Sequence, residues 1–455
     1  MTKQAINGGE AQTTRVVYLA AFVIALGGLL FGYNATVIAG AILFIKIQFS
    51  LSPFLEETVI GASLVGALIG AALGGTLADR FGRRQILFVI AVIFFLGAFA
   101  SALAPNLVSV AIGRGMVGVA IGMVSVVATL YLAEIAPDRV RGRLIGIYMT
   151  ANMVGVVCGY LVELAFDTSG NWRWMLGFPA IIAVPFAIGV RALPETPRWC
   201  VCNNRLDHAR AALRRLHDTH NVEEQMGRIQ ADVGTQVGSW AGLLRKDVRP
   251  ALIIGIGLGI LQRVTGISIA FFYGPTIFGF AGMETVSLDI LAGVGVGMAL
   301  LVGQFASMLL VDHVGRRPLL LWGYAGMVCG LVPLGLAFAT GGESLLIQGM
   351  AVGGVMLLAG AWAAGPASVT FLLIAELYPQ QIRGPAMSVA TMAIWASFLL
   401  VTFSFLTIME KFGPAITFWS YALLAGFALV AVFFGVPETK GKSLEEISSS
   451  LKRQN

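Results

Sequence analysis

The sequence predicts an all-α membrane protein with twelve transmembrane helices in two pseudo-symmetric six-helix bundles. Hydrophobic residues make up 57% of the 455 positions and charged residues only 12%, whereas a soluble domain carries about 25% charged residues. Long apolar runs recur along the chain, and a helical span needs about 20 such residues. Short motifs of the first half return in the same order in the second half.

Six apolar runs precede a long polar insert and six follow it. They are unbroken, which excludes the alternating pattern of an outer-membrane barrel. The expected spans are Val16–Ile45, Val59–Ala78, Ile86–Leu103, Val108–Ala133, Leu144–Leu164, Met175–Leu193, Ala251–Phe278, Ile290–Val311, Leu319–Ala339, Leu345–Leu373, Ala386–Ile408 and Ala415–Val436.

The insert defines three expected parts: an N-terminal bundle at 1–197, a cytoplasmic linker at 198–249, and a C-terminal bundle with a short tail at 250–455. Its segment RLDHARAALRRLHD has the spacing of an amphipathic helix, which we expect along the cytoplasmic membrane face. Arginines gather in the insert and in two short loops, and positive loops stay cytoplasmic. We therefore expect both termini in the cytoplasm and the bundles in a cytoplasmic (inner) membrane.

Composition also excludes several kinds of partner. The net charge of +6 is explained by cytoplasmic loops, so no nucleic-acid partner is expected. The cysteines Cys158, Cys200, Cys202 and Cys329 lack the spacing of a zinc site, and no metal or cofactor is expected. With 4 histidines and no HExxH pattern, an enzyme is not expected either.

The internal repeat indicates transport. GRR at Gly82–Arg84 returns at Gly315–Arg317, EIAPDRVRG at Glu134 returns as ELYPQQIRG at Glu376, and PET at Pro194 returns at Pro437. Duplicated bundles of this kind place a substrate site at their interface and let one half rock against the other.

The motifs together resemble those of the sugar porter family of the major facilitator superfamily, over nearly the whole chain. The segments that carry the resemblance are GGTLADRFGRR from Gly74, GR at Gly113, YLAEIAPDRVRGRL from Tyr131, PETPRW from Pro194 and PETKGKSLEEI from Pro437. The resemblance implies the major facilitator fold, a monomer, and a small polar solute such as a sugar, polyol or sugar acid as substrate.

Charged residues at the expected cytoplasmic ends of the spans form a candidate gate. Ion pairs between neighbouring helix ends can hold one state closed and break when the cytoplasmic side opens. The alternative is that these residues only fix topology, which explains the arginines but not the matched acids. The candidate gating residues are Asp79, Arg83, Arg84, Glu134, Arg141, Asp312, Arg316, Arg317, Glu376 and Arg383.

The seventh span, with LQRVTGISIAFFYGPTIF, resembles the family's QQxxGxNxxxYY motif and is the expected substrate wall. Gly266 and Pro275 would loosen this helix, which membranes tolerate only where the freed backbone lines a water-filled cavity. The expected substrate-binding residues are Gln262, Arg263, Ser268, Phe272, Tyr273, Trp362, Trp395, Asn34, Met149 and Asn152.

Arg263 stands where the family pattern has a second Gln. An arginine within a span is costly unless it meets water, an anion or a paired acid. Two roles stay open: Arg263 attracts a substrate carboxylate, which favours a sugar acid or cyclic hydroxy acid, or it pairs with a structural acid near a helix end.

Coupling is expected to depend on the first span. Proton-coupled members of the family carry an Asp in a segment like LLFGYD, whereas this chain has LLFGYN with Asn34. The partner expected for that Asp, Arg114, is present. Because Asn cannot titrate, we predict facilitative uniport, with proton symport as the alternative. A drug exporter and a non-transporting sensor are weaker alternatives, because the sugar porter motifs argue against the first and the short tail against the second.

Overall fold

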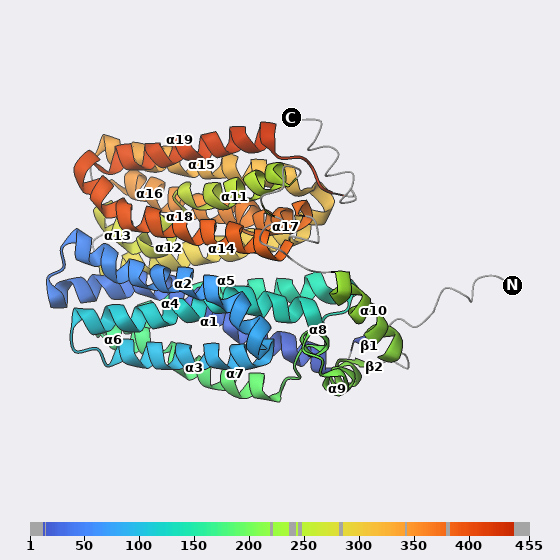
Figure 1. Cartoon of the computed structure of the whole chain (residues 1–455). Coiled ribbons are helices and arrows are strands. Elements are labelled where there is room, and N and C mark those ends of the chain that lie inside the picture. The colour runs from blue at the N-terminus through green and yellow to red at the C-terminus, as the bar shows by residue number, and fades with distance from the viewer. Residues whose placement is uncertain are drawn as a thin grey trace.

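The computed structural model of the chain describes residues 12–13, 15–218, 222–235, 243, 248–281, 285–341, 344–378 and 383–440. Two helical bundles lie side by side, and three short helices gather at one end of the N-terminal bundle (Figure 1). This arrangement matches the predicted all-α membrane fold, apart from one antiparallel ladder between β1 (Gln12–Thr13) and β2 (His217–Asp218).

The N-terminal bundle is built from α1 (Arg15–Phe49), α2 (Pro53–Phe81), α3 (Arg83–Ala102), α4 (Leu107–Ile135), α5 (Asp138–Phe166), α6 (Trp172–Gly177) and α7 (Pro179–Ala192). The insert forms α8 (Pro197–Cys202), α9 (Leu206–Leu216) and α10 (Val222–Thr235). The C-terminal bundle is built from α11 (Arg249–Val264), α12 (Ile267–Phe272), α13 (Gly274–Phe280), α14 (Val286–Val314), α15 (Arg316–Thr340), α16 (Leu345–Trp362), η2 (Ala363–Ala367), α17 (Ser368–Leu377), α18 (Arg383–Phe412) and α19 (Pro414–Gly435).

Eleven segments of the described chain are long and apolar enough to cross a membrane. The remaining expected span, the seventh (Ala251–Phe278), is divided among α11, α12 and α13. Gly266, the residue before α12, has a left-handed φ of +89°, which favours glycine because glycine has no Cβ to clash. Pro275 lies at the start of α13. The predicted loosening of this span is therefore confirmed.

Small residues let the helices of each bundle approach closely. A Cβ added to Gly32 of α1 would lie 1.7 Å from the carbonyl oxygen of Asn152 on α5. One added to Gly118 of α4 would lie 2.0 Å from the carbonyl oxygen of Ser63 on α2. Such contacts replace the hydrophobic driving force that is absent between helices in lipid.

The three short helices form a small core of their own on the end of the N-terminal bundle. Trp199 and Cys200 of α8 pack with Ala209 and Leu213 of α9 and with Met226 of α10. Helix α9 buries one face and carries basic residues in its last turn, as its amphipathic pattern predicts. We keep 1–197, 198–249 and 250–455 as proposed domain boundaries.

Hydrogen bonds join the two bundles at the end opposite α8–α10. Tyr160 of α5 donates its hydroxyl to the carbonyl oxygen of Ala270 at 3.0 Å. The Glu57 carboxylate of α2 accepts the backbone N–H and hydroxyl of Thr407 on α18, at 3.0 and 2.9 Å. These contacts hold the two bundles together at that end.

Candidate functional site

The junction of α11 and α12 concentrates buried polar side chains. Gln262, Thr265 and Ser268 are all fully buried. Both amide atoms of Gln262 and the hydroxyls of Thr265 and Ser268 have no hydrogen-bond partner among the described residues. A buried polar group left without a partner costs about 1–3 kcal/mol. Such a cluster indicates a site that a ligand or water completes.

Arg263 lies in the same segment between two aromatic rings. Its guanidinium carbon is 4.3 Å from the centre of the Phe398 ring and 5.1 Å from that of Trp362. The side chain is 8% exposed, and within the described residues it makes no ion pair or hydrogen bond. The expected alternative, a structural acid as partner, is therefore not seen in this part of the chain.

The cost of burying the Arg263 guanidinium favours a partner from outside the chain. Each aromatic contact stabilises a desolvated cation by about 2 kcal/mol, and the C-terminal end of α11 adds about 0.3–1 kcal/mol. Burying a charge costs several kcal/mol, and the guanidinium has five N–H donors to satisfy. The rings and the helix end offset a cost of this size but accept no hydrogen bond from the N–H donors, so an acceptor from outside the chain fits the site.

The aromatic residues expected at the site gather around this junction. Trp362 donates its indole N–H to the carbonyl oxygen of Gln262 at 3.0 Å, which fixes α16 against α11. Phe272 stacks on Phe398 with ring centres 5.2 Å apart. Trp395 lies one turn before Phe398 on α18, and their ring centres are 5.9 Å apart.

Tyr273 differs from the other expected contacts, because its hydroxyl already has a partner. It donates to the carbonyl oxygen of Thr402 on α18 at 3.1 Å, and its ring packs against Phe405. In this state Tyr273 holds α12 and α13 to α18 and offers no free hydroxyl to a solute.

The N-terminal bundle contributes the remaining expected residues. Phe31 of α1 packs against Trp395 across the bundles, with ring centres 6.0 Å apart. Asn34, one turn later, donates its amide to the carbonyl oxygen of Leu30 at 2.8 Å. Asn152 of α5 is 9% exposed, and Met149 packs against the main hydrophobic core.

Arg114 of α4 is buried beside Asn34. Its guanidinium nitrogens lie 3.5 Å from the Asn34 carbonyl oxygen and 3.1 Å from the Ser63 hydroxyl. No acid pairs with it in the described chain. The position expected to carry a coupling carboxylate therefore holds a neutral amide next to a buried cation.

Phe398 is a site residue that sequence reasoning missed. It contacts Arg263, Phe272 and Trp395. Its spacing of three residues from Trp395 places both on one face of α18, and that spacing was the available signal.

The first cluster of candidate gating residues joins the turn between α2 and α3, the end of α4 and the loop before α8, at the end of the N-terminal bundle that carries α8–α10. Arg83 pairs with Glu134 at 3.0 Å and with Asp79 at 2.8 Å. Glu134 also accepts the Thr196 hydroxyl at 2.6 Å. Glu195 accepts the backbone N–H groups of Arg83 and Arg84, at 3.0 and 3.2 Å.

The second cluster repeats this arrangement in the C-terminal bundle. Arg316 pairs with Glu376 at 3.1 Å, and Glu376 accepts the Thr439 hydroxyl at 2.5 Å. Glu438 accepts the backbone N–H groups of Arg316 and Arg317, at 3.1 and 3.0 Å. Sequence reasoning missed the capping roles of Glu195 and Glu438, although the repeated PET motif was their signal.

A glycine before each capped helix leaves room for the capping carboxylate. Gly82 and Gly315 precede the capped helices with φ of +101° and +107°. A Cβ there would lie 2.4 Å from a carboxylate oxygen of Glu195 or 2.7 Å from one of Glu438. Each carboxylate thereby reaches the free N–H groups at a helix N-terminus, which attract negative charge.

The pKa values of the two capping carboxyl groups are shifted in opposite directions. Burial raises the pKa of Glu195, although backbone N–H groups oppose the shift. Burial also raises the pKa of Glu438, but the N–H groups of Lys440, Arg316, Arg317 and Thr439 outweigh it, so the pKa of Glu438 lies below its ordinary value. The ionised form is thus favoured more strongly at Glu438.

The other expected gating residues make contacts other than the central Arg–Glu pairs of the two clusters. Arg84 offers its backbone N–H to Glu195, Arg141 donates to the carbonyl oxygen of Ala133 at 3.1 Å, and Arg317 stacks on Phe433 with 5.4 Å to the ring centre. The side chains of Asp312 and Arg383 lie outside the described residues.

Comparison with known proteins decides the family. The profile described as "Sugar (and other) transporter" matches residues 20–451. The chain is 36% identical over 445 residues to the "Probable metabolite transport protein CsbC" of Bacillus subtilis, covering 96% of this chain and 95% of the relative. It is 35% identical to the "Arabinose-proton symporter" of Escherichia coli, covering 96% and 94%. The chain belongs to the sugar transporter family.

The structural comparison agrees. This transporter superposes on the inward open conformation of the xylose transporter XylE from E. coli with a TM-score of 0.82 and 26% identity, covering 95% of this chain and 99% of that one. The predicted twelve-helix major facilitator fold is thus confirmed. The chain is a multi-pass protein of the inner membrane and a transporter rather than an enzyme.

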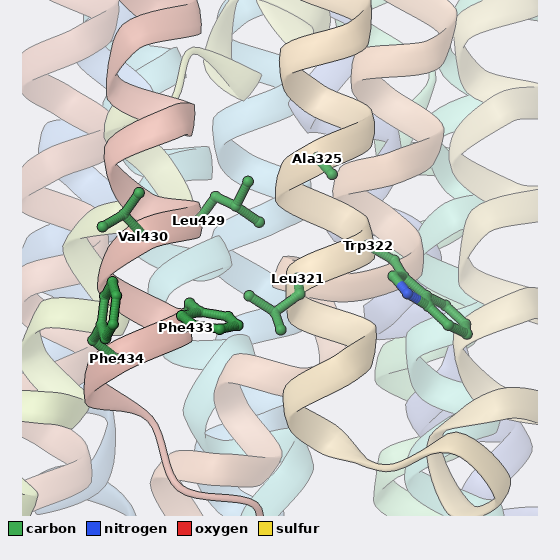
Figure 2. Close-up of a pocket in the computed structure, with 7 residues that line it drawn as sticks. All are labelled: Leu321, Trp322, Ala325, Leu429, Val430, Phe433 and Phe434. Atoms are coloured by element: carbon green, nitrogen blue, oxygen red, sulfur yellow. The ribbon is translucent and has the colours of Figure 1, made fainter.

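The transporter also has an apolar groove between α15 and α19 (Figure 2). It is lined by Leu321, Trp322, Ala325, Leu429, Val430, Phe433 and Phe434. Few hydrogen-bonding groups face it, whereas a site for a hydroxylated solute needs such groups. The polar junction of α11 and α12 therefore remains the better candidate for solute binding.

Proposed function

We propose that this chain carries a monosaccharide or related polyhydroxy solute across the inner membrane by alternating access, as a facilitative uniporter. The observation that carries the proposal is the set of unpaired buried polar atoms on Gln262, Thr265 and Ser268. A sugar offers several hydroxyl groups, each a donor and an acceptor, to complete them. Membership of the sugar transporter family supports the same substrate class.

The candidate gating clusters are formed although the outer ends are joined, so in this proposal they move with their bundles and do not break when the cytoplasmic side opens. Each cluster lies within one bundle, so it can move as part of that bundle. Joined outer ends, such as the contact between Glu57 and Thr407, suit a state closed on the outer side. The proposed membrane orientation places both termini and α8–α10 in the cytoplasm, and the proposed transporting unit is a monomer.

Uniport is proposed because Asn34 carries no titratable proton. Proton symport is the second candidate, because the related E. coli protein is named an arabinose-proton symporter. The buried Glu163 of α5, whose carboxylate accepts the Gly40 N–H at 2.7 Å, is the titratable group that this alternative would use.

Counterflow in proteoliposomes tests the proposal. Vesicles loaded with one unlabelled aldose should take up the same labelled aldose from outside, in a saturable way. Gln262→Ala should reduce this uptake about tenfold or more, because a site built for hydroxyls loses affinity when its partners are removed. Gln85→Ala, at the exposed start of α3, is the matched control and should behave as the wild type. Absence of counterflow with every neutral sugar, sugar acid and cyclic hydroxy acid tried in a folded preparation would overturn the proposal.

A further inference from the structure

Around the candidate site, the buried arginines have no acid paired with them within the described residues. Arg263 on α11 and Arg114 on α4 are both buried. The acids buried in the described parts of the bundles have other surroundings. Glu56 pairs with Lys46 at 2.9 Å, and Glu57 binds Thr407.

The two remaining buried acids do not reach the arginines either. Glu163 accepts the Gly40 N–H, and Asp289 lies in the first turn of α14 beside Gly279. Within the described residues, neither forms an ion pair with Arg263 or Arg114. In the part of the chain that the structure describes, the two buried arginines thus have no paired acid.

Arg263 is the arginine that a solute at the junction would meet. Gln262 precedes it directly and Thr265 follows two residues later, and the side-chain polar atoms of both are unpaired within the described residues. Its guanidinium is held between the rings of Trp362 and Phe398, which limits its motion. A planar guanidinium held in this way suits bidentate binding of a carboxylate.

From this geometry we infer that the natural substrate is a carboxylated polyol of about hexose size, such as a uronic acid or a cyclic hydroxy acid. The inference rests on the proposed function, because it assigns the substrate class of the same site. Arg263 binds the carboxylate, while Gln262, Thr265 and Ser268 bind hydroxyl groups. The aromatic rings of Trp362 and Phe398 exclude water and thereby strengthen the ion pair.

Matched pairs of ligands test the inference. D-glucuronate and D-glucose differ only at C6, as do D-galacturonate and D-galactose, and quinate represents the cyclic hydroxy acids. Binding is followed by tryptophan fluorescence, since Trp362 and Trp395 lie at the site, and transport by uptake of labelled ligand into proteoliposomes. The wild type should bind one or more of the carboxylates at least tenfold more tightly than the neutral sugars.

Variants at Arg263 give the sharper test. Arg263→Gln should weaken carboxylate binding about thirtyfold or more, as expected when one partner of a buried charge pair is removed, and should leave or improve the binding of neutral sugars. Arg249→Gln, at the exposed other end of α11, should change neither. Arg263→Lys keeps the charge but loses the planar fork, so it should weaken carboxylate binding to an intermediate degree, and it replaces Arg263→Gln if that variant does not fold.

The outcomes separate the inference from the proposed function. Binding of neutral sugars alone, or carboxylate binding that Arg263→Gln leaves unchanged, overturns the inference and leaves sugar transport standing. Failure of a folded preparation to bind or exchange any member of the panel overturns the proposed function together with the inference.

Discussion

Asn34 and Arg114 set the charge at the centre of the N-terminal bundle. The Asn34 carbonyl oxygen lies 3.5 Å from the Arg114 guanidinium, and the Asn34 side chain bonds to its own helix. An amide here cannot carry a proton through the transport cycle. Arg114 therefore has no titratable partner at this position, which is the physical basis for the proposed uniport.

Asn34→Asp should convert the carrier toward proton coupling. The new carboxylate would lie beside Arg114, pair with it when ionised and release it when protonated. In proteoliposomes, an acidic exterior should then drive accumulation of solute by the variant but not by the wild type. Asn34→Ser, which is neutral, is the control. Accumulation by the wild type under the same gradient would show that uniport is wrong.

Sequence reasoning identified the buried polar residues of the candidate site but not all of their contacts. Gln262, Arg263 and Ser268 followed from a motif that is continuous in sequence. The spacing of Phe398 from Trp395 shows only that the two share a face of α18. The contact of Phe398 with Phe272 and the occupied hydroxyl of Tyr273 depend on how α18 packs against α12, and no pattern within one span determines that packing.

At the scale of helices, the seventh span is broken next to the proposed solute site. Gly266 separates α11 from α12, and an added Cβ would lie 2.9 Å from the Tyr421 ring of α19. The sequence predicted this break from Gly266 and Pro275. It did not predict η2, where Pro366 lies inside a π-helical turn, because proline alone does not determine how the neighbouring carbonyls are satisfied.

Gly266→Ala should destabilise the protein and slow transport. A non-glycine residue in left-handed backbone costs about 1–2 kcal/mol, and the contact with Tyr421 adds to that cost. Gly257→Ala on α11 is the control, since nothing lies within 4 Å of its added Cβ, and it should hold or raise the melting temperature. Thermal unfolding in detergent measures both variants. Equal melting temperatures would mean that the break does not require glycine.

Replacing each capping glutamate with glutamine should reveal the difference between the two gating clusters. Glu438→Gln should lower the melting temperature at neutral pH, because the ionised cap is favoured there. Glu438 is partly exposed to water, which screens the interaction, so the expected loss is about 1 kcal/mol. Glu195→Gln should cost less, because burial already favours the neutral form.

The pH dependence of this stability difference follows from the direction of the pKa shift at Glu438. A carboxyl whose pKa is lowered on folding stabilises the protein above its unfolded pKa, here the ordinary value of 4.5, and loses that contribution as pH falls through the folded value. The difference between wild type and Glu438→Gln should therefore shrink on acidification below that value. A difference that grows on acidification would contradict this account of the cap.

At the scale of the molecule, the repeated motifs predicted both the two bundles and the paired gating clusters. The ion pairs of the two bundles occupy equivalent positions because the two halves of the chain repeat the same motifs. These pairs are Arg83–Glu134 and Arg316–Glu376. The hydrogen bonds that join the bundles do not follow from that repeat, since Glu57 and Thr407 have no counterparts in the motifs. Whether these hydrogen bonds form depends on the conformational state that the two bundles adopt.

The charge of the substrate determines how the membrane potential acts on the whole transporter. A uniporter that carries a monoanion moves one charge per cycle, and each 100 mV then contributes about 2.3 kcal/mol, or about fiftyfold in the equilibrium ratio. In proteoliposomes with a potassium diffusion potential, an interior-positive potential should drive uptake of labelled D-glucuronate, and an interior-negative potential should drive its release. D-glucose is the uncharged control and should not respond. Uptake of D-glucuronate that ignores the potential but follows a proton gradient would instead indicate electroneutral proton symport, because the proton would cancel the charge of the carboxylate.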